Sequence, residues 1–293
     1  MTILEAFLQG VLQGFTEFLP VSSSGHLSLF QYFSGNSGDA GFLFSILLHL
    51  GTLIAVCIVF WNTLWGLFLE VFSLLGDLFA GRFKASRMSA QRRMLLYLIL
   101  SLLPLFAMVL FKDKIAAFST DNDITVEGFC FLITGTLLLF ASKHDRGRKK
   151  AATMTAKDAI VIGAAQVVAT MPGISRSGST IGTGMLLGLE RSYAVSYSFI
   201  LGIPAVLGAI VLEVGDAVNE GISLPLPILV TGLLTSVVFG ILSIKLVQWV
   251  VKGNKLKYFG YYTLALGVLV IVIGTIDAYS GHMIQHFFAS LSK

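Results

Sequence analysis

The stretch PGISRSGST, residues 172–180, places one arginine among serines, glycines and a threonine inside an otherwise apolar region. Proline and glycine interrupt a helix at this point. An arginine in apolar surroundings is costly unless a negative group meets it. The stretch therefore predicts a break between two helices, at which Arg176 faces a negatively charged partner.

The composition of the whole chain indicates the solvent around that break. Of 293 residues, 55% are hydrophobic and only 12% are charged, and the mean hydropathy is +0.84. A soluble globular domain carries about 25% charged residues. We therefore expect an all-α integral membrane protein. The formal net charge of +4 comes from lysines and arginines in the connections, and it does not suggest a nucleic-acid partner.

Six stretches are long and apolar enough to cross a bilayer, which takes about 20 residues of helix. They are 41–61, 93–111, 125–142, 193–214, 225–249 and 258–277. Two further stretches, 2–33 and 158–189, carry polar residues around a central break, and each predicts a re-entrant hairpin of two short helices. Non-helical backbone at membrane depth is tolerated only inside protein or beside a water-filled cavity. The two breaks are therefore the expected site.

The basic residues predict the orientation, because cytoplasmic connections carry an excess of Lys and Arg. If the first hairpin enters from outside, the segments 62–93 and 143–157 lie in the cytoplasm and hold most of the chain's 20 basic residues. The loop 215–224 then lies outside and has no Lys or Arg. Both termini are expected outside, and the second hairpin is expected to enter from the cytoplasm.

The two hairpins resemble each other when the chain is shifted by 153 positions. The shift aligns VSSSGH with ISRSGS, and it pairs identical residues in both hairpins: Ala6 with Ala159, Gly10 with Gly163, Gln13 with Gln166, Ser22 with Ser175, Ser24 with Ser177, and Gly25 with Gly178. Each hairpin is followed by three spans, which gives two units, 1–145 and 146–293. Because three is an odd number of crossings, the second unit is expected to be inverted in the membrane. Inverted repeats whose broken helices meet near the membrane midplane are typical of transporters. We expect the two breaks to share one cavity.

The breaks hold side chains suited to a phosphate. Gln13 and Glu17 share one helix face at spacing i, i+4, and serines and His26 follow Pro20. The second break offers Arg176, whose guanidinium can bind an oxyanion in bidentate fashion. Helix N-termini bind anions through their free N–H groups. The expected substrate-binding residues are Gln13, Ser24, Ser175, Ser177 and Thr180.

Three side chains have structural alternatives. Arg176 could form an ion pair with Glu17 and have no other role, and His26 could cap a helix. His49 lies on an otherwise apolar span and is interpreted as a buried histidine with a satisfied hydrogen bond.

At these residues the sequence resembles the undecaprenyl-diphosphate phosphatases of the bacitracin-resistance type. Their motifs are Glu/Gln-x-x-x-Glu before Pro-Val-Ser-Ser-x-Gly-His, and Pro-Gly-x-Ser-Arg-Ser-Gly-x-Thr; this chain has Gln13, Glu17 and PVSSSGH, then PGISRSGST. The resemblance covers nearly the whole chain. It implies removal of the terminal phosphate from a C55 polyprenyl diphosphate, return of the carrier to cell-wall synthesis, and bacitracin resistance. It also implies a divalent cation, Mg²⁺ or Ca²⁺, for which Glu17 is the candidate ligand; Gln13 stands where some members have a second glutamate.

The expected mechanism has Ser23 attack the terminal phosphorus, with His26 or Glu17 as its base and Arg176 as the clamp on the diphosphate. In the rival mechanism Glu17 or His26 activates a water molecule and a metal bridges phosphate and Glu17. The rival function is a polyprenyl-phosphate transporter or flippase, because inverted repeats support alternating access. The expected partners are the polyprenyl diphosphate, membrane lipids and a second copy of the chain in a homodimer. The expected location is the bacterial inner membrane, with the site open to the extracytoplasmic side.

Overall fold

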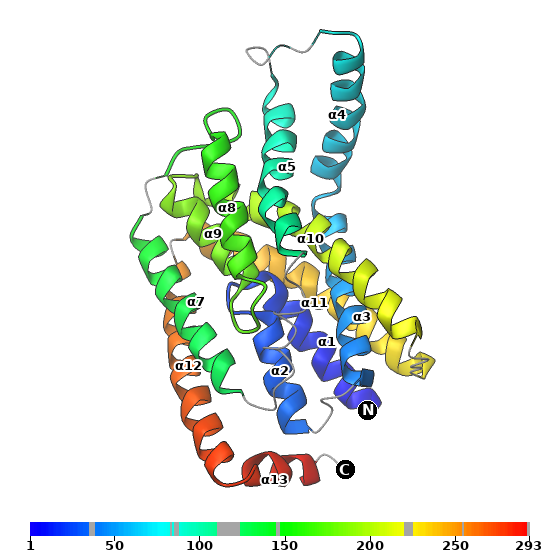
Figure 1. The fold of residues 1–293 in the computed structure, drawn as a ribbon, viewed down its shortest axis with the longest axis vertical. Helices are drawn as coiled ribbons and strands as arrows, with labels where there is room; N and C mark the ends of the chain where they lie inside the picture. Colours follow the sequence, from blue (N-terminus) through cyan, green and yellow to red (C-terminus); the bar gives the residue numbers. More distant parts are fainter. Residues whose placement is uncertain are drawn as a thin grey trace.

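The computed structural model describes residues 1–34, 39–82, 84, 88–109, 124–144, 147–219, 225–253 and 255–291. In these ranges the chain is helical and forms no strand, as the composition predicts. The helices, drawn in Figure 1, are α1 (Ile3–Phe18), α2 (Ser23–Ser34), α3 (Asp39–Val59), α4 (Trp61–Phe79), α5 (Ala90–Val109), α7 (Thr125–Lys143), α8 (Ala156–Val168), α9 (Arg176–Leu186), α10 (Arg191–Asn219), α11 (Leu226–Lys252), α12 (Leu256–Tyr279) and α13 (Met283–Leu291).

Five of the described helices are long and apolar enough to cross a membrane: α4, α7, α10, α11 and α12. The last four match expected spans. The expected span 41–61 is covered by α3, whose apolar part Leu43–Val59 is shorter. The expected span 93–111 is covered by α5 up to Val109, and its last two residues lie outside the described ranges. The protein is therefore a multi-pass membrane protein.

Helix α4 falls in the segment 62–93, for which the sequence predicts only a cytoplasmic connection. One side of α4 is polar, and there Arg92 of α5 donates to Glu70, Asp77 and Ser73 at 2.5, 2.6 and 2.8 Å. The other side is apolar and exposed, with Trp61, Trp65, Phe68 and Phe72. Glu70 and Asp77 interrupt the apolar sequence of α4, so a search for long uncharged stretches does not identify this helix as a span.

Two helix–break–helix units, α1 with α2 and α8 with α9, begin with the same cap. Thr2 Oγ1 accepts from the backbone N–H of Glu5 at 3.2 Å, and the Glu5 carboxylate accepts from the N–H of Thr2 at 2.6 Å. Thr155 and Asp158 repeat this exchange at 3.2 and 2.9 Å. Such a capping box satisfies N–H groups at the start of a helix. The 153-residue shift therefore relates the two helix–break–helix units from their capping residues, Thr2 and Thr155, onward.

The breaks are matched in the same way. Ser22 and Ser175 each accept a hydrogen bond from the backbone N–H of the glycine three residues later, at 3.3 and 3.0 Å. Each also contacts the hydroxyl of the serine two residues later, at 3.3 and 3.2 Å. The backbone of the first serine differs between the turns: Ser22 adopts a left-handed conformation, with φ of 71°, whereas Ser175 has φ of −69°.

Each unit packs against a helix from the other half of the chain. Ser243 of α11 donates to the carbonyl of Phe15 in α1 at 2.7 Å, and Ser101 of α5 donates to the carbonyl of Ala159 in α8 at 2.7 Å. This exchange brings the two breaks side by side in the middle of the molecule (Figure 1). They approach so closely that a Cβ on Gly25 would lie 2.9 Å from the Cα of Gly173.

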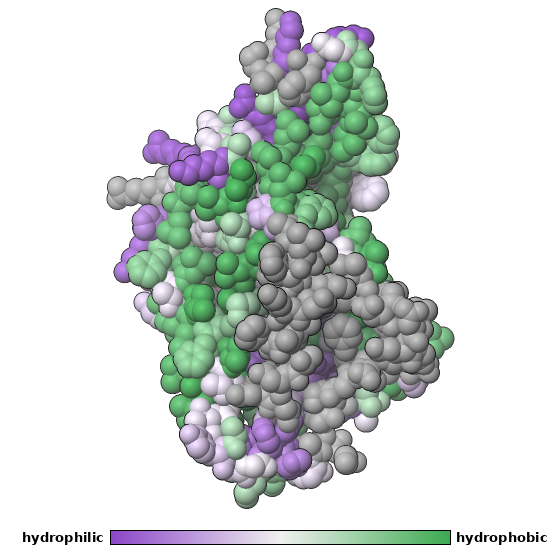
Figure 2. Space-filling view, viewed as in Figure 1, coloured by the Kyte–Doolittle hydropathy of each residue, from purple (hydrophilic) through white to green (hydrophobic). Residues whose placement is uncertain are grey.

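The surface agrees with a membrane location. Figure 2 shows apolar side chains along the flank formed by α7 and α12 and along α4. The exposed residues of these helices include Phe129, Ile133, Val268, Leu269, Phe68 and Phe72. Apolar surface of this extent is stable in lipid, whereas soluble monomers rarely expose it.

Candidate active site

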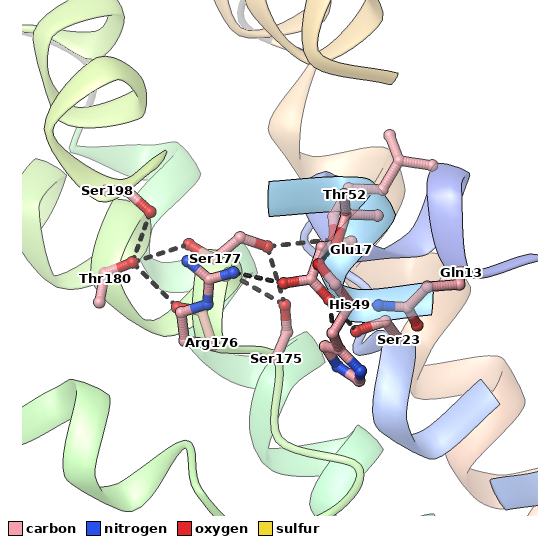
Figure 3. A network of polar contacts seen from close by, with 12 residues as sticks. Gln13, Glu17, Ser23, His49, Thr52, Ser175, Arg176, Ser177, Thr180 and Ser198 are labelled. Carbon is pink, nitrogen blue, oxygen red and sulfur yellow. Dashed lines mark hydrogen bonds and ion pairs between the residues drawn. The ribbon is translucent and has the colours of Figure 1, made fainter. Parts of the chain in front are cut away.

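Glu17, in the last turn of α1, is the centre of a polar network (Figure 3). Its side chain is only 6% exposed. The amide of Gln13, one helical turn earlier, donates to Glu17 Oε2 at 2.9 Å. The hydroxyl of Ser23, in the first turn of α2, donates to the same oxygen at 2.6 Å. The break at Pro20 therefore folds Ser23 back onto the carboxylate.

Arg176, the first residue of α9, reaches Glu17 from the other break. Its Nη2 atom donates to Glu17 Oε1 in a charged hydrogen bond. The guanidinium occupies the space left by Gly202 on α10, where an added Cβ would lie 1.5 Å from Nη1. Arg176 thus forms the ion pair with Glu17 that the sequence offers as the structural alternative to a phosphate partner, and the two breaks form one site.

The predicted hydroxyl groups of the second break line the same region. Ser177 Oγ donates to the carbonyl of Leu19 at 3.1 Å and so ties the two breaks together. Ser175 caps α9, and its backbone N–H donates to Thr134 Oγ1 at 3.0 Å. Thr180 Oγ1 donates to the carbonyl of Arg176 at 2.9 Å and lies 2.6 Å from Ser198 Oγ. These side chains hold the start of α9 in place behind Arg176.

In the first break, Ser23 faces Glu17, whereas His26 faces Tyr262 of α12. Ser24 is exposed and contacts Ser22 Oγ at 3.3 Å. The ring of His26 lies 2.7 Å from the carbonyl of Ser22 through Nδ1 and 2.7 Å from the hydroxyl of Tyr262 through Nε2. The hydroxyl of Ser23 is bound to Glu17 instead of His26. The structure therefore brings Gln13, Glu17, Ser23 and Arg176 together, and it directs His26 towards α12.

His49 of α3 lies in the site, although the sequence predicts only a buried histidine there. Its Nε2 is 3.8 Å from Glu17 Oε2, and its Nδ1 is 2.8 Å from the carbonyl of Ser45. Its side chain is 29% exposed. The signal in the sequence that could have placed His49 in the site is the 153-residue shift, which pairs His49 with Gly202, the residue beside the guanidinium of Arg176.

A small cavity adjoins the ion pair between α3 and α10. Its polar lining is formed by Glu17, Thr52 and Arg176. Its apolar walls come from both helices and from the end of α1: Phe18, Leu53, Val56, Phe199, Ile203 and Val206. The arrangement joins charged groups of both signs to an aliphatic surface.

The candidate metal ligands are few. The described residues include no group of three or more His, Cys, Asp or Glu side chains that could hold a metal ion. Near Glu17, the Oε1 atom of Gln13 is buried without a hydrogen-bond partner. Magnesium is often held by one or two carboxylates together with substrate phosphates. The donor set fits a cation shared with a phosphate substrate, held by Glu17 and Gln13.

Comparison with known proteins agrees with the motifs. The chain is 39% identical to an undecaprenyl-diphosphatase of Alkaliphilus metalliredigens over 275 residues, which cover 93% of this chain and 98% of that protein. It is 36% identical to an undecaprenyl-diphosphatase of Methanosphaera stadtmanae over 281 residues, covering 94% and 99%. It is 39% identical to one of Treponema denticola over 276 residues, covering 92% and 96%.

A family model described as bacitracin resistance protein BacA matches residues 6–269, which include both breaks. Together with the full-length relatives, this match confirms the family that the two motifs predict. The chain belongs to the bacitracin resistance protein BacA family.

Proposed function

We propose that the protein hydrolyses undecaprenyl diphosphate to undecaprenyl phosphate and inorganic phosphate. This reaction recycles the lipid carrier for cell-wall synthesis and gives resistance to bacitracin. The family and the names of the relatives support the proposal. The observation that carries it is the hydroxyl of Ser23 held 2.6 Å from the carboxylate of Glu17, which Arg176 also contacts.

Substrate binding would use the groups that now contact one another. The diphosphate competes with Glu17 for the guanidinium of Arg176, because a fork of N–H donors binds a phosphate as well as a carboxylate. The free N–H groups at the start of α9 add to the attraction for an anion. Ser24, Ser175, Ser177 and Thr180 supply hydroxyl groups around it. The aliphatic walls of α3 and α10 are suited to the first prenyl units.

In the first chemical step the oxygen of Ser23 forms a bond to the terminal phosphorus. The bond between that phosphorus and the bridging oxygen breaks. The proton of Ser23 passes to Glu17 and then to the phosphate oxygen of the departing undecaprenyl phosphate. Arg176, freed from Glu17, stabilises the charge on the transferred group. Release of the carboxylate from its ion pair makes Glu17 available as the base at this moment.

In the second step water attacks the phosphoserine. Glu17 takes a proton from the water and returns it to the oxygen of Ser23 as the bond between phosphorus and that oxygen breaks. The hydroxyl of Ser23 is restored and inorganic phosphate is released, so atoms and protons balance. The contact of Ser23 with Glu17 favours Glu17 over His26 as the base. Direct attack by water on the diphosphate, assisted by Glu17 or His26, is the rival route.

The expected Mg²⁺ or Ca²⁺ would be held by Glu17 and the free amide oxygen of Gln13, together with phosphate oxygens. When bound, it would neutralise charge on the diphosphate.

For the arrangement in the membrane we propose two re-entrant hairpins, α1–α2 and α8–α9, which enter from opposite faces and meet near the midplane. The matched caps and the exchanged packing support two inverted units, 1–145 and 146–293. We place the protein in the inner membrane with its site open to the extracytoplasmic side, and we propose a homodimer. No observation on the described residues favours a lipid transporter instead of an enzyme.

The test is phosphate release from undecaprenyl diphosphate by the purified protein in detergent, with and without a chelator. We expect phosphate release in the presence of Mg²⁺ or Ca²⁺ and its loss in the Ser23→Ala variant. A protein that is folded but releases no phosphate with any divalent cation would refute the proposed function.

A further inference from the structure

His26 is held at both ring nitrogens. The carbonyl of Ser22 can only accept a hydrogen bond, so the Nδ1 atom of His26, 2.7 Å away, carries a proton and donates it. In the neutral ring Nε2 is then an acceptor, and the hydroxyl of Tyr262 donates to it at 2.7 Å. The two contacts select one tautomer and one orientation of the imidazole.

Ring contacts fix the same orientation. Tyr262 stacks on His26 with ring centroids 5.7 Å apart and an interplanar angle of 13°. Phe131 of α7 contacts the ring edge-on at 5.2 Å and 77°. His26 is thus packed between Phe131 of α7 and Tyr262 of α12.

The group that His26 holds is the peptide next to the proposed nucleophile. The carbonyl of Ser22 belongs to the same planar peptide unit as the backbone N–H of Ser23. Ser22 adopts φ of 71°, a left-handed conformation that is unfavourable for residues other than glycine and persists only when surrounding contacts enforce it. The imidazole supplies such a contact in addition to the backbone N–H of His26, which donates to the same carbonyl at 3.2 Å.

The second break provides an internal comparison. Ser175, at the position matching Ser22, has an ordinary φ of −69°. In both breaks the backbone N–H four residues later donates to the serine carbonyl, from Ser179 to Ser175 at 2.8 Å and from His26 to Ser22 at 3.2 Å, but position 179 is a serine and has no imidazole. The second break therefore forms without an imidazole. The additional contact occurs only in the break that carries Ser23.

We propose that Tyr262 is a positioning residue for the hydrolysis, an inference that rests on the proposed function. Its hydroxyl holds the imidazole of His26, the imidazole holds the Ser22–Ser23 peptide, and the peptide directs the hydroxyl of Ser23 towards Glu17. His26 acts in this scheme through the backbone and not as the base of Ser23.

The experiment compares Tyr262→Phe with Tyr261→Phe. The first change removes the hydroxyl and keeps the stacked ring. The second is a matched control, because Tyr261 precedes it on α12, is exposed, and makes no hydrogen bond with the described residues. A hydrogen bond contributes enough to change a rate by about fivefold when it is lost. We expect kcat of Tyr262→Phe to fall about fivefold with KM within twofold, and no change for Tyr261→Phe.

A double-mutant cycle with His26→Asn tests the route of the effect. The amide of asparagine can still donate to the carbonyl of Ser22, but it does not reach Tyr262. Tyr262→Phe should therefore have no further effect in the His26→Asn background, since coupled residues are non-additive. An unchanged kcat in Tyr262→Phe, a change confined to KM, or an additive double mutant would overturn the inference.

A wild-type protein that releases no phosphate would overturn the proposed function. In that case nitrogen NMR of the His26 ring still tests the hydrogen bond between His26 and Tyr262. The wild type should show the tautomer protonated at Nδ1, and Tyr262→Phe should shift the Nε2 resonance. An unshifted resonance would refute the contact itself.

Discussion

Gly202→Ala should inactivate the protein without unfolding it. An alanine Cβ at this position would lie 1.5 Å from Nη1 of Arg176, 2.6 Å from its Cζ and 3.1 Å from its Nη2. Ordinary contacts begin at 3.4 Å, so the guanidinium must move by about 2 Å. The end of an arginine side chain moves more readily than the backbone of α10, and the new methyl group is therefore accommodated by displacing the guanidinium from Glu17.

The size of the effect follows from this displacement. A misplacement of about 1 Å in a catalytic group can reduce a rate about 100-fold. We expect kcat/KM for undecaprenyl diphosphate to fall at least about 100-fold, which corresponds to roughly 2.7 kcal/mol of transition-state stabilisation. The protein should remain folded, because the better helix propensity of alanine, about 1 kcal/mol, offsets part of the cost of separating Arg176 from the buried Glu17.

The assay is phosphate release by the purified variant, with thermal unfolding measured on the same sample. Gly208→Ala is the matched control, since it lies on the same helix and an added Cβ there meets no atom within 4 Å. It should leave activity unchanged. A folded Gly202→Ala protein with activity within a few fold of wild type would refute the assigned role of the guanidinium position.

Two other predictions concern Arg176 and the topology. Arg176→Lys keeps the charge but loses the bidentate fork, so activity should fall at least about tenfold, or roughly 1.4 kcal/mol; near-normal turnover in a folded variant would exclude the clamp role. In a background without Cys57 and Cys130, single cysteines at the exposed positions of Thr153 and Met283 should be labelled from opposite faces of sealed vesicles, and labelling of both from one face would overturn the inverted arrangement.

The features that the sequence predicts correctly depend on neighbouring residues. The serines and glycines of both breaks make hydrogen bonds two or three residues away, so their spacing is enough to predict the turns. The ion pair of Arg176 with Glu17 is the alternative that the sequence allows beside the expected phosphate partner. Residues 220–224 of the expected loop 215–224 lie outside the described residues, and the side of the membrane on which this loop lies stays a prediction.

The features that the sequence does not predict depend on distant packing. His26 is directed by Tyr262, which lies 236 residues further along the chain. His49 reaches Glu17 only because α3 packs beside α1. The sequence does not predict α4 as a span, because its two acids are neutralised only by Arg92, which lies on another helix. The residues next to each of these side chains in the sequence do not indicate which distant helix will pack against it.

The central claim is that Ser23 forms a covalent intermediate, and trapping that intermediate tests it most directly. Undecaprenyl diphosphate labelled at its terminal phosphate is mixed with the protein, quenched rapidly and digested. We expect the label on the peptide that contains Ser23, no label in Ser23→Ala, and a turnover in that variant of no more than about 1% of wild type. Ser22→Ala should be affected less. Turnover without a labelled peptide, or a Ser23→Ala variant that keeps a substantial fraction of wild-type turnover, would contradict the covalent route and favour direct attack by water.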